Sequence, residues 1–222
     1  MSAPVAARRP VAEIDPDVVV GYAGDRTPDA ELILGRGARL RSGSILYAGS
    51  RIGDHFQTGH HVVVREECEI GDDVSIWSNT VIDYGCRIGD RVKIHSNCYV
   101  AQFTEIEDDA FLAPGVSIAN DLYPGQPSSA RVMGGPHIGA GAQVGVNATL
   151  LPYVRLGAGC MVGSGSVVTR DVPAGAVVVG SPARVRGAVD DLRQIGARLA
   201  YDPRSASRFR MVDRATRDPE DW

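Results

Sequence analysis

The chain has 222 residues, 44% of them hydrophobic, and 23 Lys and Arg against 27 Asp and Glu give it a formal net charge of −4. This slightly acidic balance argues against a nucleic-acid partner, because phosphate binding normally leaves a basic face. No apolar run is long enough for a membrane-spanning helix, or for a signal peptide at the amino terminus, so we expect a cytoplasmic protein without a membrane contact. One main domain is expected, and 26 Gly against 4 Phe predict many tight turns around small aliphatic side chains.

Residues 1–31 precede any regular pattern and are expected to form an N-terminal cap segment. A cap is needed at this end, because the first strands of a stack would otherwise present unpaired backbone groups to solvent.

Residues 32–183 carry a repeat of six residues. Cut into hexads from its first leucine, the chain places an aliphatic residue at every first position before an interruption, with one threonine as the exception: Leu34, Leu40, Leu46, Ile52, Thr58, Val64, Ile70, Ile76, Ile82, Ile88, Ile94, Val100, Ile106, Leu112 and Ile118. The register resumes at Ile138 and runs to Pro173. No amphipathic helix has this period, so the pattern predicts an all-β solenoid, a parallel β-helix with three hexads in each triangular coil and about seven coils.

The fourth and fifth positions of the hexads fit sharp corners between short strands. Most fourth positions hold the residue types that best tolerate a left-handed backbone, among them Gly37, Gly43, Gly49, Asn79, Gly85, Asn97, Gly115, Gly141, Asn147 and Gly165. Fifth positions are mostly small and include all four cysteines, which are Cys68, Cys86, Cys98 and Cys160. We therefore expect these cysteines to be buried fillers, not metal ligands or a disulfide set.

The repeat is interrupted by residues 124–137, PGQPSSARVMGGPH, which are expected to form a protruding loop. A loop rich in Pro, Gly and Ser that leaves a rigid solenoid is usually functional.

Residues 184–222 are expected to form a short C-terminal helix and a tail. Apolar residues recur there at spacings of three and four, which marks one face of a helix: Val185, Val189, Leu192, Ile195 and Leu199. The tail from Asp202 alternates charges and prolines and is expected to be loosely ordered.

Leu34 to Arg184 resembles the hexapeptide-repeat acyltransferases, and this resemblance implies a left-handed coil, which the spacing alone does not fix. The ending VGSGSVVTRDVPAGAVVVGSPARVRG is similar to the donor-binding end of acetyltransferases in this superfamily. The stretch IHSNCYVAQFTEIEDDAFLAPGVSIANDLYP is similar to the acceptor region of N-acetyltransferases that modify nucleotide-linked amino sugars. The resemblance further implies a homotrimer with active sites between adjacent subunits and acetyl-CoA, or another acyl-CoA, as the donor co-substrate.

The resemblance assigns donor-binding roles to residues of the late coils. Those that match the corner positions along the pantetheine arm, or positions near the adenine and phosphates, are Gly145, Val146, Gly163, Ser164, Thr169, Arg170 and Arg184. Missing side chains at the glycines would let a thin arm approach the backbone, and arginine suits phosphate oxygens. The glycines are equally well explained as ordinary corner residues.

The acceptor site is expected to include His95, Asn97, Asn120 and Asp121. Asn97 matches an active-site asparagine of the sugar acetyltransferases, although asparagine is also a routine corner residue. Where the O-acetylating branch carries a loop histidine, this chain has Asn120 and Asp121. That departure suits an amine acceptor, because a neutral amine attacks a thioester with little assistance, and Asp121 could orient or deprotonate an ammonium.

The leading hypothesis is an acyl-CoA-dependent N-acyltransferase, most simply an acetyltransferase, acting on a primary amine of a sugar that is linked to a nucleotide. An O-acyltransferase with His95 or His137 as base stays open, as does a non-catalytic scaffold. A third alternative is a zinc enzyme like the γ-class carbonic anhydrases, with His60 and His95 as ligands, but position 100 is Val where a third histidine would stand. No metal is therefore expected.

Overall fold

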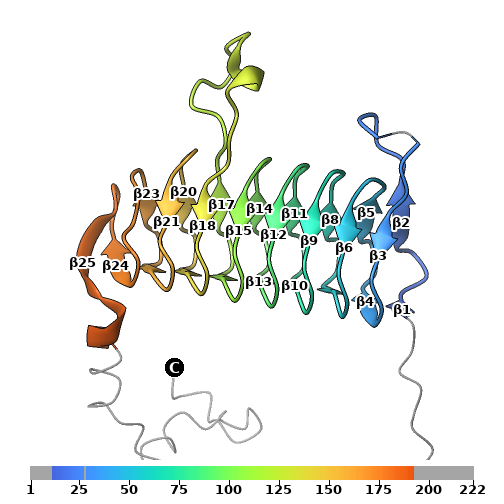
Figure 1. Ribbon diagram of the computed structural model, residues 1–222, viewed down its shortest axis with the longest axis horizontal. Helices are drawn as coiled ribbons and strands as arrows, with labels where there is room; N and C mark the ends of the chain where they lie inside the picture. The colour runs from blue at the N-terminus through green and yellow to red at the C-terminus, as the bar shows by residue number, and fades with distance from the viewer. Residues whose placement is uncertain (1–11, 28, 193–222) are drawn as a thin grey trace, which may run out of the picture.

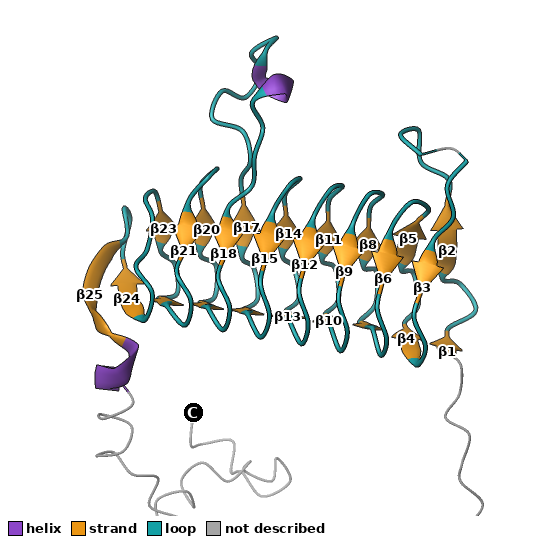
Figure 2. Ribbon diagram, viewed as in Figure 1, coloured by secondary structure: helices purple, strands orange, loops and turns teal. Residues whose placement is uncertain are grey.

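A computed structural model describes residues 12–27 and 29–192, and in it two- to five-residue strands stack coil on coil into a triangular prism (Figure 1). Three sheets form its sides (Figure 2). Sheet A has ten strands, in the order β1 (Ala12–Ile14), β4 (Ala38–Leu40), β7 (Gln57–Thr58), β10 (Ser75–Ile76), β13 (Lys93–Ile94), β16 (Phe111–Leu112), β19 (Gln143–Val144), β22 (Met161–Val162), β24 (Ala176–Val179) and β25 (Arg184–Ala188).

Sheets B and C are shorter. Sheet B has eight strands, β2 (Val19–Tyr22), β5 (Ile45–Tyr47), β8 (Val63–Val64), β11 (Val81–Ile82), β14 (Tyr99–Val100), β17 (Ser117–Ile118), β20 (Thr149–Leu150) and β23 (Val167–Val168). Sheet C has seven, β3 (Ile33–Leu34), β6 (Arg51–Ile52), β9 (Glu69–Ile70), β12 (Arg87–Ile88), β15 (Glu105–Ile106), β18 (His137–Ile138) and β21 (Arg155–Leu156). The eight strands of sheet B make about one coil more than the sequence predicted, because β2 adds to this sheet from within the predicted cap segment.

The first positions of the hexads form the core, as predicted. Strands one coil apart pair in parallel with first positions opposite one another, for example Ile76 with Ile94 and Ile82 with Val100. Thr58, the one polar first position, is accommodated because its hydroxyl accepts a hydrogen bond from the backbone N–H of Arg41 at 2.9 Å. The core is therefore one continuous column of stacked aliphatic side chains along the prism axis.

The corners adopt the left-handed backbone that the fourth positions predict. A positive φ occurs at every fourth position from Gly37 to Gly115 and again from Gly141 to Gly165. Six of these positions hold side chains that rarely adopt it: His55, His61, Glu67, Arg91, Phe103 and Tyr153. The stacking of coils thus imposes the corner conformation even where the local sequence does not favour it, at a cost of about 1–2 kcal/mol per residue.

All four cysteines are free and buried, in agreement with the filler role expected for them. Burial raises the pKa of the Cys160 thiol to about 11 and also raises the pKa of Cys98. The thiols of Cys98 and Cys160 therefore stay protonated near neutral pH.

Both ends differ in detail from the prediction. Strands β1 and β2 extend sheets A and B, so part of the predicted cap continues the solenoid. At the other end, residues 184–188 form β25, antiparallel to β24, and a helix begins only at 189; placing Val185 on that helix was wrong. The hairpin forms because Gly180, at φ +102, allows the chain to reverse after β24. The predicted helix positions Ile195 and Leu199, the tail from Asp202 and residues 1–11 of the cap lie outside the described residues.

The protruding loop occupies residues 119–136, between β17 and β18, and rises well clear of the prism (Figure 1). It carries one 3₁₀ turn, η1 (Ser129–Arg131). His137, predicted to end the loop, is instead the first residue of β18. Across residues 12–27 and 29–192, no helix has the length and apolar character needed to cross a bilayer.

Candidate functional site

A column of residues runs along the corner between sheets A and B, which we call the AB corner. Each member directly follows the core residue of a sheet A strand, and since those core residues pair from coil to coil, the members stack on one another. In chain order the column is Gly59, Trp77, His95, Ala113, Gly145 and Gly163. Its late part thus has almost no side chains, and its middle part has two large rings.

The late part of this column is the floor of a groove of about 260 Å³, the donor groove. It is lined by Phe111, Ala113, Gln143, Val144, Gly145, Val146, Met161, Val162, Gly163 and Ser164. Four of the seven predicted donor-binding residues therefore come together in one place. A narrow, mostly apolar trough with exposed backbone fits an extended chain-like ligand.

The two glycines of the groove also have a packing reason. A Cβ at Gly145 would approach the backbone N of Ser164 to 2.6 Å, and one at Gly163 would press on the side chain of Val179. Close packing of neighbouring coils therefore requires glycine at position 145 whether or not a ligand binds.

His95 lies one coil before the donor groove, in the same column of the AB corner. Its ring stacks on that of Trp77, with ring centroids 4.5 Å apart and planes at 8°. It also contacts the ring of Phe111, which lines the groove, with ring centroids 4.9 Å apart. Within the described part of the chain the imidazole makes no hydrogen bond or ion pair, so both ring nitrogens are available. Two aromatic contacts fix the ring plane.

Asn97 lies on the same corner, two residues beyond His95, with a φ of 61°. It is exposed, and its side-chain amide has no partner among the described residues. Its corner role and a ligand-binding role are both compatible with this geometry.

Asn120 and Asp121 lie elsewhere, at the corner between sheets B and C, which we call the BC corner. The Asn120 amide donates to Oε1 of Gln102 at 2.6 Å, and the Asp121 carboxylate accepts a hydrogen bond from the backbone N–H of Tyr123 at 2.7 Å. Both therefore shape the base of the loop. Since sheet B separates the two corners, a single chain does not bring the four predicted acceptor residues together.

A partly buried polar network supports Asn120, and the sequence analysis missed it. Asp83 accepts hydrogen bonds from Gln102 at 2.7 Å and from the Tyr99 hydroxyl at 2.8 Å, and Gln102 in turn holds Asn120. Burial, followed by the hydrogen bond to the Asp83 carboxylate, raises the pKa of Tyr99 to about 12. Tyr99 therefore remains a hydrogen-bond donor at neutral pH.

The same network continues to a fully buried carboxylate. Arg65 donates two hydrogen bonds to Glu66, of 3.0 and 2.8 Å, and lies 3.5 Å from Asp83. Burial alone would raise the pKa of Glu66, but the Arg65 guanidinium outweighs it and holds that pKa below its usual 4.5. The spacing of eighteen residues between equivalent positions could have revealed this network, because it stacks side chains of neighbouring coils.

The other three residues predicted to bind the donor lie outside the groove. Thr169 and Arg170 follow β23 at the BC corner, and Arg184 begins β25 near the last coil. Arg170 and Arg184 are exposed. Only a long ligand that leaves the groove could reach them.

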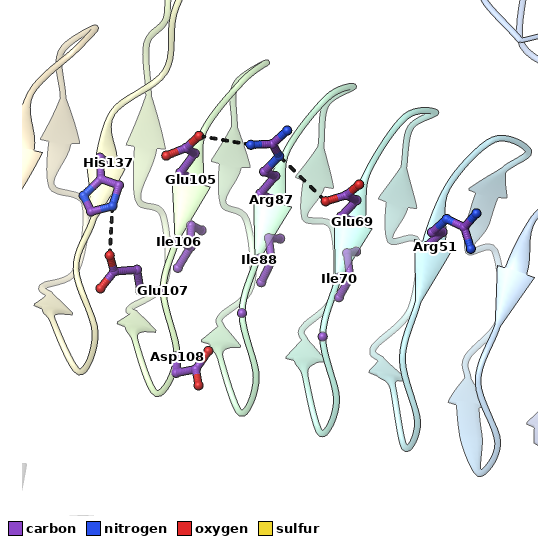
Figure 3. Close-up of a pocket in the computed structure, with 12 residues that line it drawn as sticks. Arg51, Glu69, Ile70, Arg87, Ile88, Glu105, Ile106, Glu107, Asp108 and His137 are labelled. Carbon is purple, nitrogen blue, oxygen red and sulfur yellow. Dashed lines mark ion pairs between the residues drawn. The ribbon is translucent and has the colours of Figure 1, made fainter.

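Sheet C carries a wider hollow of about 570 Å³, in which His137 lies (Figure 3). Charged side chains alternate along it, and Arg87 lies 3.7 Å from both Glu69 and Glu105. His137 is 3.0 Å from Glu107. Most charges of this surface are thus paired with one another, and it lies on a different side of the prism from the donor groove.

The histidines considered as zinc ligands are not joined by a third ligand at position 100. Val100 is completely buried in the core, so its position is turned away from His60 and His95. Throughout the described ranges no three His, Cys, Asp or Glu side chains are placed to hold a metal ion.

The sequence and the fold resemble those of known transferases. Residues 49–83, 85–120 and 135–170 match the family described as bacterial transferase hexapeptide (six repeats). An acyltransferase of UDP-N-acetylglucosamine from Campylobacter jejuni has a similar fold, with a TM-score of 0.55 over 90% of this chain and 80% of that one. At 19% sequence identity this likeness concerns the fold alone.

Curated relatives match over short stretches. Serine acetyltransferase 4 of Arabidopsis thaliana is 37% identical over 86 residues, 39% of this chain and 24% of the relative. A 2,3,4,5-tetrahydropyridine-2,6-dicarboxylate N-acetyltransferase of Staphylococcus aureus is 57% identical over 42 residues, 19% of this chain and 18% of the relative. The chain thus spans a quarter or less of the length of these relatives.

Proposed function

The chain belongs to the family of bacterial hexapeptide transferases, and from that premise we propose that it is an acyl-CoA-dependent N-acyltransferase. In the simplest case it transfers an acetyl group to a primary amine of an amino sugar that is linked to a nucleotide. The observation that carries the proposal is the donor groove, whose lining residue Phe111 contacts the imidazole of His95.

The donor groove supports a thioester of coenzyme A as the donor. Its floor of Ala113, Gly145 and Gly163 leaves room for a thin arm, and its walls are apolar. Arg170 and Arg184, exposed beyond the groove, supply positive charge for phosphates. A bound acyl-CoA would thus present its thioester near His95.

The reaction needs little chemical assistance. An amine nitrogen attacks the thioester carbonyl, the C–S bond breaks, and the amine proton passes through a base to the departing thiolate. His95 is placed to accept that proton, and a backbone N–H at the corner would stabilise the oxyanion. Most of the acceleration would come from holding amine and thioester in contact.

A homotrimer would complete the site. Asn120 and Asp121 occupy the BC corner while His95 and Asn97 occupy the AB corner, so only the loop of an adjacent subunit could bring them together. Sheet B offers the surface for this contact. The outward positions of β5, β8, β11 and β14 are apolar and stand in one row, Ile45, Val63, Val81 and Tyr99, whereas sheet C carries alternating charges.

The buried free thiols suit a reducing compartment, so we place the enzyme in the cytoplasm, where acyl-CoA is available.

A second candidate is O-acylation of a sugar or small natural product. It is favoured by His95, because a hydroxyl needs a base more than an amine does and this imidazole has no hydrogen-bond partner among the described residues. It is opposed by Asn120 and Asp121 standing where the O-acetylating branch has its loop histidine.

One experiment tests the assignment. The double substitution Asn97→Ala, Asp121→Ala should lower the rate of CoA release from acetyl-CoA and an amino-sugar nucleotide by at least about a hundredfold, the scale of general acid–base assistance. An unchanged rate would remove these two residues from the site. Consumption of the matching hydroxyl sugar, together with loss of turnover in His95→Ala, would instead establish the O-acyltransferase.

A further inference from the structure

Trp77 is a large exposed side chain that the site as described does not use. It lies on the AB corner one coil before His95, and 37% of its surface is exposed. One face of the indole is covered, because the His95 ring stacks on it at 4.5 Å.

The other face of the indole has no ring or side chain from its own column against it. The preceding residue of the column is Gly59. It lies beside Trp77, because the residues directly before them, Thr58 and Ile76, pair with each other. Gly59 adds no side chain against the indole, and 37% of the Trp77 surface is exposed. This is the environment in which aromatic residues stack on a planar ligand.

Polar side chains lie along the AB corner on both sides of Trp77. The amides of Asn79 and Asn97 and the imidazoles of His60 and His61 all lie on the AB corner of coils at or next to that of Trp77. None of the four side chains makes a hydrogen bond or ion pair to any described residue. They could form hydrogen bonds with the edge of a stacked ring and with phosphate oxygens attached to it.

Distance identifies which ring would stack. A ring in van der Waals contact with the free face would lie about 8 Å from the His95 ring, since the first stack measures 4.5 Å and the second about 3.5 Å. The ring that carries the reacting amine must be next to His95. The ring on Trp77 is therefore a second ring, separated from the first by a spacer.

We propose that Trp77 is the stacking platform for the nucleobase of a nucleotide-linked acceptor. This inference rests on the proposed function and deepens it, because it makes the nucleotide a recognised part of the acceptor. A ribose and two phosphates then span the path from the base to the sugar amine at His95, past Asn79 and Asn97. An open-chain acceptor such as serine would leave the platform empty.

Fluorescence of Trp77 tests the proposal directly, because the chain has two tryptophans and Trp222→Phe leaves Trp77 alone. Uridine, guanosine and thymidine diphosphates are titrated in the presence of saturating CoA, which fills the donor groove, with ribose 5-phosphate and free glucosamine as ligands that lack a base. Free tryptophan serves as the control for absorption of light by the nucleotides. We expect saturable quenching by at least one diphosphate and none by the other two ligands.

Kinetics separate base stacking from mere support of His95. Trp77→Leu should raise KM for an amino-sugar nucleotide about tenfold, the usual effect of losing one base–aromatic stack, and leave KM for the free amino sugar unchanged. Trp77→Tyr should restore most of the loss, and Ile33→Ala, which removes an exposed apolar side chain from sheet C, should change neither constant.

Several outcomes would overturn the proposal. These are quenching by CoA or by glucosamine alone, no quenching by any diphosphate, or an equal fall in kcat for both acceptors in Trp77→Leu. Binding of acetyl-CoA, measured in the same samples by calorimetry, separates this failure from failure of the proposed function. If acetyl-CoA binds while no diphosphate reaches Trp77, only the nucleobase platform is wrong.

Discussion

The carboxylate of Glu66 has no exposed surface, yet its environment keeps it charged. Arg65 binds it through a two-bond fork, and Arg26 lies 3.9 Å away. A buried charge is tolerated only when its partners satisfy it, so removal of one member leaves the others uncompensated. Through Asp83 and Gln102 this pair reaches Asn120, and the base of the loop depends on it.

Glu66→Gln should therefore destabilise the fold by about 1–3 kcal/mol at pH 7, less than a fully buried pair because Arg65 is partly exposed. Since the folded-state pKa of Glu66 lies below 4.5, its contribution is present above that pH and is lost as pH falls through the folded value. Thermal unfolding of the wild type and of Glu66→Gln between pH 7 and pH 3 measures this contribution. The two melting temperatures should converge on acidification, and a constant difference would contradict the account.

At the scale of the strand and its corner, glycine plays two distinct roles. Gly165 has a φ of +68 and open space where a Cβ would be, so only backbone conformation selects it. Gly157 follows a core strand residue of sheet C, and a Cβ there would collide with the backbone of Ala174 in the next coil. The first role is conformational and the second is steric.

Alanine substitutions should separate these roles. Gly165→Ala should cost about 1 kcal/mol, the strain of a left-handed corner, because nothing is displaced. Gly157→Ala should cost about 3 kcal/mol, because two coils must move apart. Chemical denaturation of each variant gives both values. Equal costs would show that corner strain and coil packing are not separable in this way.

The period of six allowed prediction of the strands, the corners, the cysteines and the loop, because each follows from one position in the repeat. The strand β25 could not be predicted, since Val185 and Val189 fit a helical period and only the preceding chain reversal pairs this segment with β24. Gly145, Val146, Gly163 and Ser164 were assigned to the donor site by the resemblance to acetyltransferases, and the stacking of coils brings them together in one groove. The Trp77–His95 stack was missed because it joins residues of different coils, although their spacing of one coil encodes it.

For the whole molecule, the three faces of the prism are chemically unlike. Sheet B presents a row of apolar side chains, and sheet C presents Arg51, Glu69, Arg87 and Glu105 in alternation. An apolar face on a solenoid is expected to be covered by another chain. The division of the proposed acceptor residues between two corners points to the same need.

The double substitution Val63→Arg, Val81→Arg should convert the proposed trimer to a monomer, because each chain would carry two positive charges on the face that meets its neighbours. Light scattering should then give the chain mass of 23.6 kDa in place of three times that value, and turnover should disappear. Gln57→Arg places the same charge on exposed sheet A and should leave mass and turnover unchanged. A wild-type protein that is already monomeric would contradict the assembly.

The most direct test of the central claim is calorimetric titration of acetyl-CoA into three proteins. The wild type should bind with micromolar affinity at one site per chain. Ser164→Phe, which places a ring in the donor groove from an exposed position, should weaken binding at least about tenfold, whereas Ala158→Phe, at the equivalent exposed position beside sheet C, should not. Absence of binding to the wild type, or equal affinity in both variants, would show that this groove does not hold the acyl donor.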